Sequence, residues 1–320
     1  MTTFSPINRN DFLQNGRDDN PVRCIQPLNQ PTKWKTLNAM PINFLDRLTL
    51  IYNVLLLIII ALRSSRIQYA ELLFIFHSAV ILLALGIIKF DSLYRRNWSG
   101  HLHAWYSLVF LYPYYLETIY FKYSYLPFEL DPYLAAFENF LFNSQPSIWL
   151  ADQFPALWIK ELMSFFYLGH FYLGVIVAIY LYRKRHQYFL EFASTVVLTF
   201  AFCYLFFIFF PSSGPQFYFN NSIFKPEIGI FYYVLSYIEL NIEIPSGAFP
   251  SSHVAVEGLV ILYTQKYIKS RWRYVILFLS FGLIMSTVYI RAHYVIDVMA
   301  GLAVCSVFYH LMQYYDPYHV

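Results

Sequence analysis

The sequence predicts an all-α protein, a polytopic bundle of about eight transmembrane helices in which the last six form a core. Of its 320 residues, 58% are hydrophobic and only 13% are charged, whereas a soluble domain carries roughly 25% charged residues. Several apolar segments reach the length of about 20 residues that a helix needs to cross the hydrocarbon layer. Basic residues gather in alternate loops between these segments. These observations indicate that lipid is the solvent of the chain.

The predicted elements follow in order along the chain. Residues 1–43 are polar, contain Asn, Asp, Pro and Gln, and lack the pattern of a signal peptide, so we expect a mostly disordered tail. Residues 44–101 are expected to hold two additional spans, near 44–62 and 69–88. Residues 102–320 are expected to form one six-span membrane domain, with spans near 102–121, 161–182, 188–210, 252–268, 273–290 and 293–312.

The long segment 123–160 lies between the third and fourth spans. Leu134, Phe137 and Leu141 have the spacing of one helix face. We therefore expect a helix here that lies in the membrane interface rather than crossing it.

The basic loops give an orientation. Three alternate loops carry most of the positive charge, at Lys89, Arg95 and Arg96; at Arg183, Lys184 and Arg185; and at Lys266, Lys269, Arg271 and Arg273. Because cytoplasmic loops are enriched in Lys and Arg, we expect these loops, the tail and both termini in the cytoplasm. Segment 123–160 is then on the other side, as is Asn220-Asn221-Ser222, which fits a glycosylation acceptor.

Composition argues against other kinds of site. A net charge of +3 is too small for general nucleic-acid binding, and we expect no nucleic-acid partner. Cys24, Cys203 and Cys305 are too far apart in the chain to indicate a disulfide framework or a metal site. His101 and His103 have no ligand partners nearby in the sequence, so we expect no metal and no cofactor. Three further histidines stand alone within spans and are expected to be packed: His77, His170 and His310.

Three segments with reactive side chains fall on the non-cytoplasmic side: 210–216 (FPSSGPQ), 249–253 (FPSSH) and 286–297 (STVYIRAHYVID). In the second segment, Ser251 or Ser252 can cap a helix that begins there. A helix start presents unpaired N–H groups and a positive dipole end, which suits a phosphate. His253 then faces the same site. The alternative is an ordinary helix start with an interfacial histidine.

The third segment is more specific. His293 and Asp297 are four residues apart, so we expect them on one helix face. A carboxylate on one ring nitrogen fixes the tautomer and makes the other nitrogen a better nucleophile. Arg291 can bind two phosphate oxygens with its planar guanidinium. The alternative is a structural ion pair between Arg291 and Asp297.

The motifs FPSSH and RAHYVIDVMAG resemble the second and third signature motifs of the type 2 phosphatidic acid phosphatase superfamily, and most closely its inositolphosphoceramide-synthase-like (inositolphosphotransferase) branch. PSSGPQ resembles the position of the first motif, and FENFLFNSQPS is also similar. The resemblance implies an enzyme that forms a phosphohistidine without metal. It implies that His293 is the nucleophile, Asp297 its orienter and His253 the general acid. It also implies that Ser251, Ser252 and Arg291 bind phosphate.

The chain departs from the family pattern in its positive charges. Gln216 stands where the first motif usually supplies Lys or Arg, and Thr287 stands where the third motif has Arg. Gln216 is therefore expected to meet the phosphate through a neutral hydrogen bond, which is weaker than a charge-assisted one. Lys225 is a candidate for the missing charge.

Glu257 repeats the spacing of four residues, this time after His253. We hypothesise that its carboxylate holds His253 protonated, as a general acid requires. The alternative is a hydrogen bond between helices that has no part in catalysis.

Two enzyme functions and one other class remain open from the residues. The first is a lipid-phosphate phosphatase, in which water attacks the phosphohistidine. The second is a phosphotransferase, in which an alcohol replaces water. The third is a non-catalytic transporter or lipid-binding membrane protein. The expected partners are a lipid phosphate, the bilayer and, for the second function, an alcohol acceptor.

Overall fold

The computed structural model describes residues 42–94, 97–219, 229–315 and 317–318. Most of the expected tail 1–43 lies outside these residues, as do Cys24, Lys225 and the expected glycosylation acceptor 220–222. The described part is helical and contains no strand, so the predicted all-α fold is confirmed. Its longer helices are α1 (Phe44–Arg63), α2 (Ala70–Tyr94), α3 (Asn97–Val109), α4 (Leu111–Phe121), α5 (Asp131–Phe142), α6 (Pro146–Gln153), α7 (Leu157–Leu168), α8 (Leu173–Lys184), α9 (His186–Phe209), α11 (Ile230–Asn241), α12 (Ser252–Tyr267), α13 (Trp272–Tyr289) and α14 (Val295–Tyr315).

Five of the described helices are long and apolar enough to cross a membrane: α1, α2, α9, α13 and α14. A sixth span results if α7 and α8 count as one, although they are bent by 41° around a short turn. The other two expected spans are helical but shorter. Residues 102–121 are divided at Phe110, because Pro113 in the first turn of α4 has no N–H to continue the helix of α3. The expected span at 252–268 is α12, which has 16 residues.

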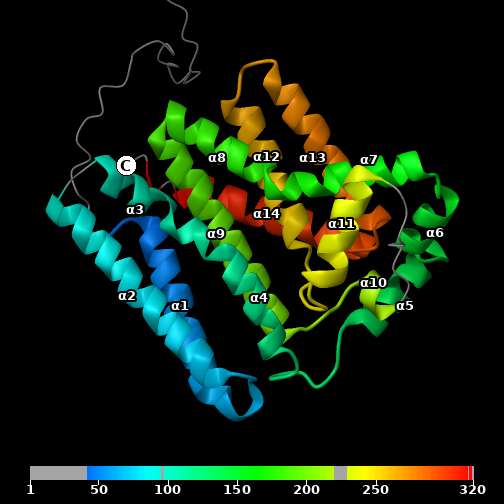
Figure 1. Cartoon of the computed structure of the whole chain (residues 1–320), viewed down its shortest axis with the longest axis horizontal. Coiled ribbons are helices and arrows are strands. Elements are labelled where there is room, and N and C mark those ends of the chain that lie inside the picture. Colours follow the sequence, from blue (N-terminus) through cyan, green and yellow to red (C-terminus); the bar gives the residue numbers. More distant parts are fainter. Residues whose placement is uncertain (1–41, 95–96, 220–228, 316, 319–320) are drawn as a thin grey trace, which may run out of the picture. The chain divides into compact units, whose positions relative to one another are not determined.

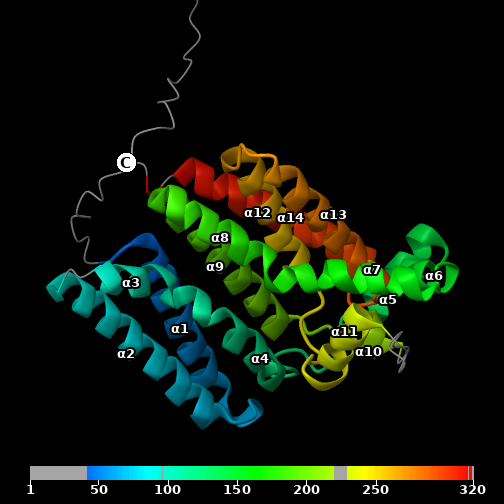
Figure 2. The same ribbon diagram turned by 45° about the horizontal axis from the view of Figure 1, so that its top comes forward.

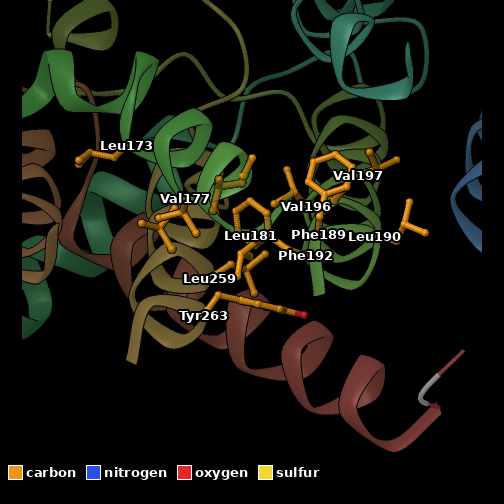
Figure 3. Packing of buried hydrophobic residues seen from close by; sticks show 14 of the residues in the cluster. Leu173, Val177, Leu181, Phe189, Leu190, Phe192, Val196, Val197, Leu259 and Tyr263 are labelled. Atoms are coloured by element: carbon orange, nitrogen blue, oxygen red, sulfur yellow. The ribbon is translucent and has the colours of Figure 1, made fainter. Parts of the chain in front are cut away.

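The main core lies where α8, α9 and α12 meet. Figure 3 shows Leu181 of α8, Phe192 of α9 and Leu259 of α12 in one cluster. Leu181 and Leu259 are almost fully buried in it. The cluster packs against the middle of α12 and holds the helix in place. The first turn of α12 lies outside the cluster and can carry polar residues.

Helices α1 and α2 form an antiparallel pair that packs against α9 and α3 (Figures 1 and 2). Polar side chains join this pair to its neighbours. Nδ1 of His77 in α2 donates to the side-chain oxygen of Asn53 in α1, and Nε2 of His77 lies 3.1 Å from Glu117 of α4. His103 of α3 has one ring nitrogen 2.9 Å from Asp46 and the other 3.0 Å from Asp91. These contacts hold the ring of His103 between α1 and α2.

Helix α5 confirms the expected helix within 123–160, but its polar side faces the protein. The carboxylate of Asp131 accepts from the N–H groups of Ser213 and Gly214. Glu138 accepts from the N–H of Val295 at the start of α14. Leu134 is buried against this region, so it does not share the outer face with the side chains that are exposed: Tyr133, Phe137, Phe140 and Leu141.

Candidate active site

Two histidines from separate elements meet at one end of α12 and α14. His253 is in the first turn of α12, and His293 is in the turn between α13 and α14. His253 Nδ1 lies 3.2 Å from His293 Nε2. His293 is buried, while His253 is half-buried. The structure thus brings together the two residues that the sequence proposed from motifs 40 residues apart.

The hydrogen bonds define one arrangement of protons. His293 Nδ1 lies 2.9 Å from the carbonyl oxygen of Ala248, which can only accept, so Nδ1 carries the proton. Burial lowers the pKa of His293 to about 4, against the opposing effects of the Ala248 hydrogen bond and the charge of Glu243. The ring is therefore neutral at pH 7 and presents the lone pair of Nε2. His253 donates from Nδ1 to this lone pair.

Asp297 lies beside His293, but its contact with the ring differs from the expected one. Its Oδ2 is 3.4 Å from His293 Nδ1 and accepts from the N–H of Tyr294 at 2.9 Å. His293 precedes α14, so the two residues do not share a helix face, and this part of the prediction is wrong. The Ala248 carbonyl is the hydrogen-bond partner of the ring, and the buried carboxyl group of Asp297 lies next to it.

The expected phosphate-binding residues surround the pair. Ser251 caps α12, and its hydroxyl oxygen accepts from the N–H of Val254. Ser252 follows as the first residue of the helix, and both serines are buried. Arg291 is buried and pairs with Asp152 at 2.8 Å, so the ion pair considered with Asp297 is wrong. Arg291 has φ +67°, a left-handed conformation that turns the chain between α13 and α14.

Gln216 lies at the site, and its side chain faces the carboxyl group of Glu239. Its backbone N–H donates to the carbonyl of Arg291, and its side-chain amide donates to Glu239 at 2.8 Å. Burial, and next the charge of Glu243, raises the pKa of Glu239 to about 8. Glu243 accepts from Tyr115 at 2.6 Å, and its charge acts on His293. These two glutamates were not among the residues expected at the site, although their spacing of four residues just before FPSSH was a usable signal.

Positive charge reaches the loop 211–216 from a different element. Lys122, which follows α4, donates to the hydroxyl of Ser213 and to the carbonyl of Pro245, and it pairs with Glu129 at 3.0 Å. These residues line a cavity of about 540 Å³ together with Pro132, Phe217 and Tyr218. The sequence expected such a charge from Lys225, which is outside the described residues.

Glu257 does not contact His253. The second ring nitrogen of His253, Nε2, lies 3.4 Å from the hydroxyl of Tyr167 in α7. His170, in the turn between α7 and α8, has its ring centroid 4.1 Å from that of His253. The hypothesis that Glu257 holds His253 protonated is therefore wrong, because both ring nitrogens have other partners. His170 was expected to be an ordinary packed histidine, and no sequence signal tied Tyr167 to the site.

The described residues include no group of three or more His, Cys, Asp and Glu side chains arranged to hold a metal ion. A family model of the PAP2 superfamily matches residues 134–311, more than half of the chain. No curated protein and no solved structure matches the chain. The matched region contains His253, His293 and the helices that position them. The chain therefore belongs to the PAP2 superfamily, whose phosphatase-like chemistry fits a membrane protein with two facing histidines.

Proposed function

We propose that this protein is an integral membrane lipid-phosphate phosphatase or phosphotransferase that acts through a phosphohistidine at His293. The observation that carries the proposal is the 3.2 Å approach of His253 Nδ1 to His293 Nε2 in a buried, neutral pair. One ring offers a lone pair and the other offers a proton. A nucleophile and an acid held at hydrogen-bond distance are what phosphoryl transfer to a side chain requires.

In the first half-reaction, Nε2 of His293 attacks the phosphorus of the lipid phosphate. The P–N bond forms and the P–O bond to the lipid breaks. His253 first takes a second proton, on Nε2, from the protonated phosphate of the incoming lipid, so that its Nδ1 proton can pass to the leaving oxygen and leave a neutral ring. The Ala248 carbonyl holds His293 in the tautomer that attacks, and Asp297 stabilises the positive charge that the phosphorylated ring acquires.

The start of α12 and Arg291 stabilise the negative charge that develops on the phosphoryl oxygens. Ser251 and Ser252 place the first turn of α12 beside His253, so the positive end of the helix dipole points at the site. Arg291 is one residue from Ala292 and two from His293, and its exposed partner Asp152 lies at the protein surface. A phosphate can exchange places with this carboxylate on the guanidinium.

In the second half-reaction, water or an alcohol attacks the phosphohistidine and gives its proton to His253 Nδ1. The P–N bond breaks and a new P–O bond forms. Water yields inorganic phosphate, whereas an alcohol yields a new phosphate ester, as in the inositolphosphoceramide-synthase-like branch. The residues named serve both outcomes. The basic residues in alternate loops support a site on the non-cytoplasmic face, with both termini in the cytoplasm.

The test is to trap the intermediate. Purified protein in detergent is mixed with ³²P-labelled phosphatidic acid, quenched in alkali and analysed for acid-labile label on the protein. We expect label on wild type and on His310→Ala, which changes an exposed histidine of the same helix α14. We expect none on His293→Ala. Equal labelling of His293→Ala and wild type would contradict the proposal.

The fate of the label separates the candidates. Release of inorganic phosphate without added alcohol identifies a phosphatase. Transfer of label to an added polyol or lipid alcohol identifies a phosphotransferase. If wild type acquires no label and turns over no lipid phosphate from a panel, the chain is a lipid-binding or transport protein instead.

A further inference from the structure

The ring of His253 has to change its protonation during the proposed cycle. It must carry a proton on Nδ1 in the first half-reaction and must leave Nδ1 bare for the second. A neutral imidazole has one N–H, so its two nitrogens must exchange donor and acceptor roles. The partner of Nε2 determines whether both states are stable in a buried site.

That partner is the hydroxyl of Tyr167. It lies 3.4 Å from His253 Nε2, and Tyr167 is only 2% exposed. A phenol both donates and accepts hydrogen bonds. It can donate to a bare Nε2, and it can accept from Nε2–H once the ring is protonated or has lost its Nδ1 proton.

The fold explains how Tyr167 reaches this place. It is the penultimate residue of α7, just before the turn Gly169–Phe171 at which α7 and α8 bend by 41°. The bend also places His170 against the ring of His253. The end of α7 and the turn after it therefore both contact the ring of His253, through Tyr167 and His170.

We propose that Tyr167 is a positioning residue that acts through His253 and lets its Nδ1 serve as acid in the first half-reaction and as base in the second. This inference rests on the proposed function. The Nε2 proton comes from the protonated phosphate of the incoming lipid. In the first half-reaction, the Nδ1 proton goes to the leaving oxygen as the P–O bond breaks, while Nε2–H donates to the phenol oxygen. In the second, Nδ1 takes the proton of the attacking water or alcohol as the P–N bond breaks, and the Nε2 proton leaves with the released phosphate. Tyr167 keeps its own proton over the cycle.

The test uses two leaving groups. The full-length protein is assayed as wild type and as Tyr167→Phe with phosphatidic acid, whose alkoxide needs a proton, and with p-nitrophenyl phosphate, whose phenolate leaves without one. The rate of His293 phosphorylation is measured in a single turnover, because only this step contains the leaving group. We expect Tyr167→Phe to lower this rate for phosphatidic acid by about 10- to 100-fold, a part of the roughly 10²–10⁴-fold effect of general acid catalysis. We expect KM to change little, and the loss of the phosphorylation rate with p-nitrophenyl phosphate to be several times smaller.

The matched control is Tyr263→Phe. Tyr263 is also buried, and its hydroxyl contacts Thr195 and Glu191 near the other end of α12. It should show no difference between the two leaving groups. Tyr167→Met, which keeps the apolar bulk but no hydroxyl, should behave like Tyr167→Phe.

The outcomes separate the two proposals. Equal losses with both substrates, or no loss with phosphatidic acid, would overturn the role of Tyr167 while leaving the phosphohistidine intact. An absence of labelled His293 and of turnover in wild type would overturn the proposed function itself.

Discussion

At the residue scale, a backbone carbonyl holds His293, the proposed nucleophile. The Ala248 oxygen accepts from His293 Nδ1 at 2.9 Å, while the nearer oxygen of Asp297 is at 3.4 Å. A carboxylate usually has this role in histidine-based sites. Here the carboxylate supplies charge and fixes the chain by accepting from the N–H of Tyr294. The tautomer of His293 is thus independent of the Asp297 charge.

Because Ala248 and Asp297 have these separate roles, we predict that Asp297→Asn has a moderate effect on kcat. The asparagine oxygen can still accept from Tyr294, and Ala248 still fixes the tautomer, so only the buried charge is lost. We expect kcat to fall by far less than the roughly 10⁴-fold drop seen when the triad aspartate of a serine protease becomes asparagine. The measurement is single-turnover labelling of His293 with phosphatidic acid. A drop as large as that of His293→Ala would show that the carboxylate, not the carbonyl, sets the tautomer.

The neighbouring carboxyl groups of Glu239 and Glu243 lead us to predict that kcat/KM depends on pH. The pKa of Glu239 is raised to about 8, so its carboxyl is neutral below that pH and negative above it. A negative charge beside Gln216 repels a phosphate. We expect kcat/KM for phosphatidic acid to fall through a rise in KM as the pH passes about 8. The pH–rate profile of Glu239→Gln should lose this decline, and that of Glu71→Gln, at an exposed position of α2, should keep it. An identical decline in Glu239→Gln would assign it to another group.

At the element scale, the close contact of α12 with α14 sets the distance between the two histidines. A Cβ at Gly301 would lie 2.5 Å from the carbonyl oxygen of Ser251 and 3.2 Å from the Cβ of Val254. Backbone oxygen cannot move aside as a flexible side chain can. The glycine in the motif RAHYVIDVMAG is therefore the residue that lets α14 approach the start of α12.

We expect Gly301→Ala to separate the helices and to cost about 1–3 kcal/mol, as overpacking does. A displacement of about 1 Å can reduce a rate by roughly 10²-fold, so kcat should fall strongly. The control is Gly86→Ala in α2, where nothing lies within 4 Å of the new Cβ. This control should be as active as wild type and more stable by about 0.5–1 kcal/mol. Thermal unfolding in detergent measures the stability of the two variants, and kcat measures their activity. A Gly301→Ala variant as stable and as active as wild type would refute the close contact.

Helix α5 shows why its outer face was only partly predictable. Its apolar spacing indicated a helix, and that is correct. The spacing did not reveal that Asp131 and Glu138 face inward, because their partners are backbone N–H groups of loops far along the chain. A hydrophobic pattern reports which residues avoid water. It does not report which polar residues find partners inside.

At the scale of the whole molecule, a buried polar pair joins the first two helices to the rest. His77 of α2 and Glu117 of α4 lie 3.1 Å apart with side chains 0% and 4% exposed. Removing one partner of such a pair leaves the other unpaired in an apolar environment, which lowers the stability of the protein by about 3–5 kcal/mol. Replacing both with apolar residues can be nearly neutral.

We therefore expect His77→Leu and Glu117→Leu each to lower the thermal stability in detergent markedly. The double variant should be more stable than either single variant. The kcat of the remaining folded protein should stay near that of wild type, because neither residue contacts the catalytic histidines. Additive losses in the double variant would show that the pair is not coupled.

The sequence alone determined the helical membrane fold, the three motifs and the roles expected of His253 and His293, because these depend on local apolar length and on residue type at fixed spacing. The match to the PAP2 superfamily agrees with that interpretation. Only the tertiary structure decided which group holds each ring nitrogen. Ala248, Tyr167, Glu239 and Lys122 are between 45 and 171 residues away from His293 in the chain, and the group that Ala248 contributes is a backbone carbonyl, which carries no sequence pattern. Their contribution arises because the ends of α4, α7 and α11 come together with the loops at the site, and such packing is a property of the folded chain as a whole.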